Sequence, residues 1–154
     1  RVMNRLEITE SQDKLVDELV NTVIPKTELP GAKDLNVKGF VWVMVDDCLS
    51  DDLQTIFLTG LTQFEERYKQ VSGDAFSSAG QQERISNLNS IIGVENSDEK
   101  SDHIVFLEVI KTFTIQGYMQ SEYIMKDVMP YNLIPGKNPT CEPVEPNQNL
   151  NINA

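Results

Sequence analysis

The chain has 154 residues, of which 40% are hydrophobic, and a formal net charge of −11. This length and hydrophobic content fit one globular domain with its own core rather than a disordered chain. The negative charge argues against nucleic acid, whose phosphates attract lysine and arginine, and against anionic membrane surfaces. It is compatible with a basic protein partner, although a solvated acidic surface is the simpler interpretation.

The longest apolar run, Phe40 to Val45, is much shorter than a transmembrane helix, which needs about 20 apolar residues. We therefore expect no direct membrane insertion. The two cysteines, Cys48 and Cys141, lie far apart, and neither has a second cysteine or a histidine at metal-ligand spacing. The sequence leaves open whether they form a disulfide.

A first amphipathic helix is predicted over about Glu10 to Val23. Thr9 and Gln12 fit a capping box at its start, and Pro25 and Pro30 end the pattern.

A second helix is predicted from the apolar spacing between Val37 and Leu49, after the chain restarts at Leu35. The β-branched and aromatic run Phe40 to Val45 would allow a strand, but the longer 3.6-residue period favours a helix. We expect Asp46-Asp47 on the polar face and Cys48 as a buried thiol on the apolar face.

A third helix is predicted over about Asp51 to Ser72, with Ser50 as N-cap and Gly73 after its end. Gly60, inside this helix, indicates a close approach of another helix. The apolar stripe that should face the core consists of Leu53, Ile56, Phe57, Leu61, Phe64, Tyr68 and Val71.

A fourth helix should follow a loop anchored by Phe76 and should end at Gly93. Its expected apolar set is Ile85, Leu88, Ile91 and Ile92.

A fifth helix should begin at Asp102, capped by Ser101, after a polar loop over 94–101. It is apolar on more than one side, which is typical of a helix in the middle of a bundle. The pattern is lost at Gly117 to Glu122, which we interpret as a hinge where packing ends.

The predicted architecture is all-α: a bundle of about five helices with an extended, proline-rich C-terminal tail. Five of the seven prolines lie in this tail, from Pro130 to Pro146. We expect one domain over 1–147, including the packed tail, and a frayed terminus over 148–154.

Motifs for catalysis are missing from the sequence. The single histidine, His103, fits a surface or capping role, and no nucleophile elbow, dinucleotide loop or P-loop pattern occurs. The acidic pairs Asp46-Asp47 and Asp51-Asp52 lack the spacing of a calcium loop and are better explained as flanking a helix junction. We predict no catalytic, cofactor-binding or metal-binding residue, and therefore a binding protein; an enzyme using the acidic cluster and a metal is the less favoured alternative.

Three groups of residues resemble a known family in their order and spacing. They are Ile24-Pro25 with Leu29-Pro30-Gly31-Ala32, then Gly117-Tyr118-Met119-Gln120-Ser121-Glu122, and finally Tyr131-Asn132-Leu133-Ile134-Pro135-Gly136 with Cys141-Glu142-Pro143. Across roughly Leu15 to Val144, the chain resembles the gluconate 2-dehydrogenase subunit 3 family.

The resemblance implies a non-catalytic accessory subunit of a flavin-dependent sugar or polyol dehydrogenase. In that family a large flavoprotein subunit carries FAD and the chemistry, electrons often pass to a cytochrome subunit, and the small subunit is thought to support export or maturation of its partner. The resemblance also implies a periplasmic or exported protein whose targeting segment lies upstream of residue 1.

The tyrosines near the end of the fifth helix suit either a partner interface or an internal contact between tail and bundle, the latter slightly favoured. The expected partner interface comprises Tyr118, Ser121, Glu122, Tyr123, Tyr131, Pro135, Gly136 and Cys141. The tail departs from the family pattern at Met119-Gln120 and over 137–140. The alternative hypothesis is therefore a stand-alone secreted helical interaction domain with no oxidoreductase partner.

Overall fold

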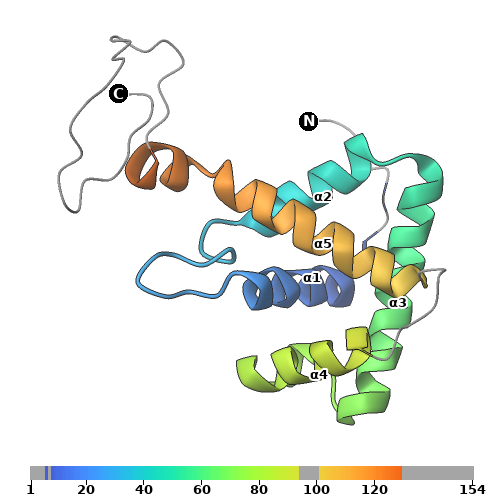
Figure 1. Cartoon of the computed structure of the whole chain (residues 1–154). Coiled ribbons are helices and arrows are strands. Elements are labelled where there is room, and N and C mark those ends of the chain that lie inside the picture. The colour runs from blue at the N-terminus through green and yellow to red at the C-terminus, as the bar shows by residue number, and fades with distance from the viewer. Residues whose placement is uncertain (1–5, 7, 94–100, 130–154) are drawn as a thin grey trace.

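The computed structural model describes residues 6, 8–93 and 101–129 and is drawn in Figure 1. These residues form five α-helices, one 3-10 turn and one π-helical turn, with no strand among them. In chain order they are α1 Glu10–Val23, α2 Val37–Cys48, α3 Asp51–Ser72, the 3-10 turn η1 Phe76–Ser78, α4 Gln81–Gly93, α5 Asp102–Met119 and the π turn η2 Ile124–Val128. The all-α prediction is confirmed, while the expected tail and frayed terminus lie outside the described residues.

Helix α5 is the central element of the bundle. It contacts α1, α2 and α3, and α3 runs crosswise to α1 and α4 (Figure 1). The fully buried residues of α5 recur every three or four positions and form one stripe; they are Phe106, Ile110, Thr114 and Gly117. Residues on both sides of this stripe are half-buried, as expected for a helix with neighbours on several sides.

Local capping chemistry determines where α1 begins. The Oγ1 of Thr9 accepts a hydrogen bond from the N–H of Gln12 at 3.3 Å, and the Oε1 of Gln12 accepts one from the N–H of Thr9 at 2.9 Å. This is the predicted capping box, and both bounds of α1 agree with the prediction.

The ends of α3 are set in the same way. The Oγ of Ser50 accepts from the N–H of Leu53, and Gly73 takes the left-handed conformation with φ of 82°. At α5, Ser101 occupies the N-cap position, but its side chain makes no capping hydrogen bond.

The centre of the core is a cluster of aromatic rings. Phe57, Phe64, Tyr68, Phe76 and Phe106 are all fully buried. Edge-on contacts join Phe57 to Phe106 at 4.9 Å and Tyr68 to Phe76 at 4.9 Å between ring centroids. The predicted core role of the α3 aromatic residues and of Phe76 is confirmed.

The outer parts of several predicted apolar stripes are exposed. Leu53 and Val71, near the two ends of α3, are 41% and 47% exposed. The core prediction is also wrong for two further residues, which are exposed: Ile85 and Ile92.

The orientation of the last turn of α2 also differs from the prediction. Its buried stripe is Val37, Val41 and Val45, which carries the neighbouring Asp46 into the interior and leaves Cys48 exposed. The Nε2 of Gln54 donates to the backbone oxygen of Asp46 at 3.0 Å. The predictions of an outward Asp46 and a buried Cys48 are therefore wrong.

None of the helices in the described part of the chain combines the length and the apolar character needed for a membrane crossing.

Gly60 lies where α3 and α5 approach each other closely. A Cβ atom at this position would lie 2.3 Å from the backbone oxygen of Asp102 and 2.7 Å from the Cβ of Phe106. Both distances are shorter than van der Waals contact, so α5 can pack at this distance only because residue 60 lacks a side chain. The predicted close approach is confirmed.

We predict that Gly60→Ala lowers the free energy of unfolding by about 1–3 kcal/mol, because the added methyl group meets backbone that cannot move independently of α5. The control is Gly93→Ala, where no atom lies within 4 Å of the added Cβ. This control should change the free energy by less than about 1 kcal/mol, in the stabilising direction. Urea denaturation measures both, and equal effects would contradict the packing argument.

Candidate functional site

Two segments that carry the family resemblance meet at one end of the bundle. The hydroxyl of Tyr118, at the end of α5, donates a hydrogen bond of 2.9 Å to the backbone oxygen of Pro30. Pro30 lies in the connection between α1 and α2, 88 residues away in sequence. We call this region, residues 24–36 together with 117–122, the α1–α5 junction.

The α1–α2 connection is closed by its own backbone. The N–H of Ala32 donates to the oxygen of Ile24 at 2.9 Å, and the N–H of Val37 donates to the oxygen of Ala32 at 3.0 Å. Ala32 is fully buried. A Cβ at Gly31 would lie 2.6 Å from the backbone nitrogen of Lys26. Only a glycine therefore fits where the connection folds back on itself.

Helix α5 continues past Gly117 and ends at Met119, within the segment where the apolar pattern is lost. Gly117 is buried, and a Cβ there would lie 2.6 Å from the Cδ1 of Phe40 and 3.1 Å from the Cγ1 of Val37. The interpretation of residues 117–122 as the place where packing ends is therefore wrong for Gly117, although the helix does end within this segment and Met119, Gln120 and Glu122 are exposed. The apolar pattern breaks at Gly117 because the side chain that fills this space belongs to α2.

The other predicted interface residues that the structure describes lie just beyond α5. The Oγ of Ser121 accepts a 3.4 Å hydrogen bond from the N–H of Ile124, the first residue of η2. Glu122 is exposed and forms an ion pair of 2.6 Å with Lys126, whereas Tyr123 is half-buried. The hydrogen bond from Lys126 lowers the pKa of Glu122.

A shallow groove of about 370 Å³ brings η2 and the α1–α2 connection together. It is lined by Leu35, Ser121, Glu122, Tyr123, Lys126 and Asp127. The remaining predicted interface residues, Tyr131, Pro135, Gly136 and Cys141, lie outside the described residues, and their role stays a prediction.

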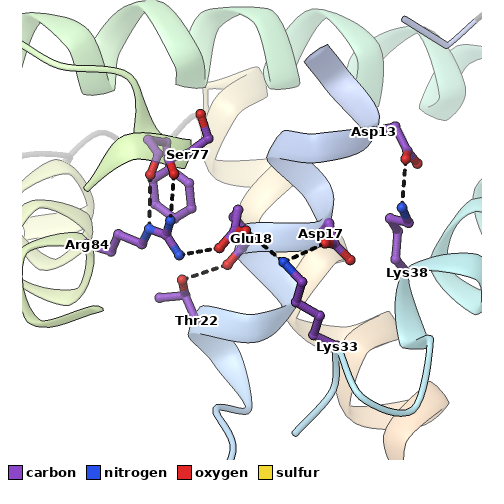
Figure 2. Close-up of polar contacts among 9 residues, drawn as sticks. Asp13, Asp17, Glu18, Thr22, Lys33, Lys38, Ser77 and Arg84 are labelled. Carbon is purple, nitrogen blue, oxygen red and sulfur yellow. Dashed lines mark hydrogen bonds and ion pairs between the residues drawn. The ribbon is translucent and has the colours of Figure 1, made fainter. Parts of the chain in front are cut away.

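A polar network holds the α1–α2 connection on its other side (Figure 2). Glu18 of α1 accepts hydrogen bonds from the Nη1 of Arg84 at 2.6 Å and from the Nζ of Lys33 at 2.8 Å. Lys33 also pairs with Asp17 at 2.9 Å. The network thus joins α1, α4 and the α1–α2 connection through one carboxylate.

Arg84 is the most buried ion-pair partner of this network, at 7% side-chain exposure. Its Nε and Nη2 donate to the backbone oxygens of Phe76 and Ser77 at 2.9 and 3.0 Å, and its guanidinium lies 5.0 Å from the centroid of the Phe76 ring. These contacts compensate for its loss of water. Sequence reasoning missed this residue because hydrophobic periodicity carries no information about which charged residue finds a buried partner.

The electrostatics of Glu18 combine opposing effects. Burial raises the pKa of its carboxyl, but hydrogen bonds from Lys33 and Arg84 and their positive charges together lower the pKa below the ordinary value of 4.5. Conversely, the hydrogen bonds from Glu18 and Asp17 raise the pKa of Lys33. The charged forms of both groups therefore stabilise the fold.

The residues first considered for catalysis lie elsewhere. His103 is half-buried and lines a shallow pocket with Gln63, Glu66, Arg67 and Gln70. Asp51 and Asp52 lie in the first turn of α3, where they complement the helix dipole. Within the residues that the structure describes, no group of three or more histidine, cysteine, aspartate or glutamate side chains could hold a metal ion.

We predict that Glu18→Gln lowers the free energy of unfolding by about 1.5–3 kcal/mol at pH 7, because the charge-assisted hydrogen bonds to Arg84 and Lys33 are lost. Since folding lowers the pKa of Glu18, its carboxylate stabilises the fold fully above the ordinary value of 4.5. That contribution is lost as the pH falls through the lower, folded-state pKa. The deficit of the variant should therefore shrink below pH 4.5, as measured by urea denaturation at a series of pH values.

The control for this prediction is Glu65→Gln. Glu65 pairs with Lys69 at 2.9 Å on the exposed face of α3. Loss of the Glu65 charge should lower the free energy of unfolding by less than about 0.5 kcal/mol. A deficit for Glu18→Gln that stays constant between pH 7 and pH 3 would contradict the role assigned to the carboxylate.

A family model for gluconate 2-dehydrogenase subunit 3 matches residues 10–136 of the chain. The matched range contains every described helix and both segments of the α1–α5 junction. Neither the curated proteins nor the solved structures include a match to this chain. The family model covers well over half of the 154 residues and confirms the resemblance seen in the sequence. The chain belongs to the gluconate 2-dehydrogenase subunit 3 family.

Proposed function

We propose that this chain is the non-catalytic accessory subunit of a flavin-dependent sugar or polyol dehydrogenase complex. The family match carries the proposal, because the family is that of a subunit of a dehydrogenase made of several subunits. A chain of this family works bound to another protein, and its own chemistry is that of recognition.

In this proposal the large flavoprotein subunit holds FAD and oxidises the substrate. The helical subunit supports the export, maturation or stability of that partner, and a cytochrome subunit accepts the electrons. The complex works in the periplasm or outside the cell.

The geometry of the described residues fits a docking protein. The two close helix contacts at Gly60 and Gly117 and the buried Glu18–Arg84 pair make a rigid bundle. A rigid surface loses little conformational entropy when a partner binds. The net charge of −11 favours association with a partner surface that carries lysine and arginine.

We predict that the gene for this chain lies beside one for a large flavoprotein, and that co-expression of the two gives a complex that stays together in size-exclusion chromatography. The yield of soluble, FAD-loaded large subunit should rise several-fold over expression of the large subunit alone. Flavin absorbance per mole of large subunit measures the loading, and expression with an unrelated secreted protein is the control.

Failure of the two proteins to co-elute, with an unchanged yield of the large subunit, would contradict this function. That result, together with a monodisperse chain in solution, would favour a stand-alone secreted interaction domain instead. Cell fractionation of the complete gene product tests the proposed location independently, because a cytoplasmic product would contradict it.

A further inference from the structure

We infer that a cavity between the start of α1 and one face of α2 binds the guanidinium group of an arginine side chain from another polypeptide. We call this cavity the α1–α2 pocket. Its volume is about 380 Å³, which lies within the roughly 300–1,000 Å³ range of small-ligand sites. The pocket lies away from the α1–α5 junction and from the Glu18–Arg84 network, and none of its lining residues has a role in either.

The wall of the pocket on the α2 side is a strip of one helical face. Gly39, Trp42, Val43 and Asp46 form this strip at spacings of three and four residues. The three atoms nearest to a Cβ at Gly39 would all belong to the side chain of Asn36, the first at 3.2 Å. Close packing against another helix therefore does not require this glycine, unlike the glycines at the two α5 contacts. The missing side chain instead leaves space in the wall of the pocket.

The charge of the lining is negative. Glu10 lies exposed in the first turn of α1, and Asp46, in the last turn of α2, is only 6% exposed. A third carboxylate, Asp13, accepts a hydrogen bond of 2.6 Å from Lys38, which balances its charge (Figure 2). The lining that the structure describes contains no lysine or arginine. Because Glu10 and Asp46 add two further negative charges, the pocket is complementary to a cation.

Trp42 supplies an aromatic wall that is held in place. Its Nε1 donates a hydrogen bond of 2.9 Å to the Oδ1 of Asp13, and its ring lies edge-on to that of Phe57 at 5.9 Å between centroids. Tryptophan is the aromatic side chain that attracts cations most strongly. Leu6 and Ile8 line the same cavity and offer apolar surface to the methylene stem of a long basic side chain.

Arginine suits this lining better than lysine does. A guanidinium is planar, stacks on aromatic rings and donates two parallel hydrogen bonds to a carboxylate. It is also more weakly hydrated than an ammonium group, so less free energy is lost when it moves beside the buried Asp46. Free arginine carries its own carboxylate, which the negative lining repels, whereas in a polypeptide this group is a neutral amide. The occupant is therefore an arginine within a polypeptide.

The test uses the single tryptophan of the chain, because fluorescence from Trp42 reports directly on the pocket. The probe is the peptide acetyl-Gly-Arg-Gly-amide, titrated into the full chain, and we expect a saturable change in emission. The same peptide with citrulline, which keeps the shape of arginine without its charge, should bind at least about tenfold more weakly. The lysine peptide should bind at least about threefold more weakly. No dehydrogenase enters this test, so its result is independent of the proposed function.

Variants of the full chain locate the site. Gly39→Leu places a side chain in the wall and should raise the dissociation constant of the arginine peptide at least about tenfold. Asp46→Asn and Glu10→Gln should each raise it at least about threefold. The matched control is Asp47→Asn, which removes the same charge from the exposed neighbour outside the lining and should leave the dissociation constant within about twofold. Circular dichroism and the urea midpoint verify that each variant folds, and Glu10→Gln tests the charge at an exposed position.

Four results would overturn the inference. The first is the absence of a saturable change in emission up to about 10 mM arginine peptide. The second is equal binding of the citrulline or the lysine peptide, which would contradict recognition of a guanidinium. The third is an equal loss of affinity in Asp46→Asn and Asp47→Asn, which would place binding elsewhere. The fourth is free arginine that binds as tightly as the peptide, which would contradict a polypeptide source.

The alternative occupant is an arginine of the same chain. Arg1 and Arg5 precede Leu6, which lines the pocket. The double variant Arg1→Gln with Arg5→Gln in the full chain should leave both the emission of Trp42 and the dissociation constant of the arginine peptide unchanged. If this variant shifts the emission without peptide and lowers the dissociation constant at least about threefold, the chain fills its own pocket, and the assignment to another polypeptide is overturned.

Discussion

Helix α5 is held near each end by a contact that only glycine permits, and the arrangement of the bundle depends on these two contacts. At its start, the backbone of Asp102 lies where a side chain on Gly60 would be. Near its end, the ring of Phe40 fills the space beside Gly117. The first contact meets the backbone of α5, and the second brings a ring of α2 against the backbone of α5, so together they set how close α5 stands to α3 and α2. The position of Tyr118 beside the α1–α2 connection follows from this placement.

The residues that carry the family resemblance therefore act first within the chain. Gly31 lets the connection fold back, Gly117 admits Phe40, and Tyr118 bonds Pro30, while Lys33 ties the other side of the connection to Glu18. A hydroxyl that is already bonded internally contributes less to a partner. We therefore regard Gly31, Gly117 and the Tyr118 hydroxyl as groups that support the fold of the junction.

Much of the fold could be predicted because its determinants are local. The capping box at Thr9 and the caps at Ser50 and Gly73 fixed the bounds of α1 and α3. Contacts between helices were harder to predict from the sequence. Because glycine lowers helix propensity wherever it occurs, the pattern could not distinguish a buried glycine at position 117 from the end of a helix. Periodicity also assigned Asp46 and Cys48 to the wrong sides. Of the candidate site, the sequence identified the segment around Tyr118, but the Glu18–Arg84 pair depends on which helices the fold brings together.

The central claim is that the Tyr118 hydroxyl stabilises the fold through its bond to Pro30 and does not itself contact the partner. The most direct measurement compares Tyr118→Phe with Tyr123→Phe in both unfolding free energy and affinity for the large subunit. Loss of the bond to Pro30 should lower the free energy of unfolding by about 0.5–1.5 kcal/mol in the first variant only, with its dissociation constant unchanged. A dissociation constant that rises at least about tenfold while the unfolding free energy stays the same would contradict the claim.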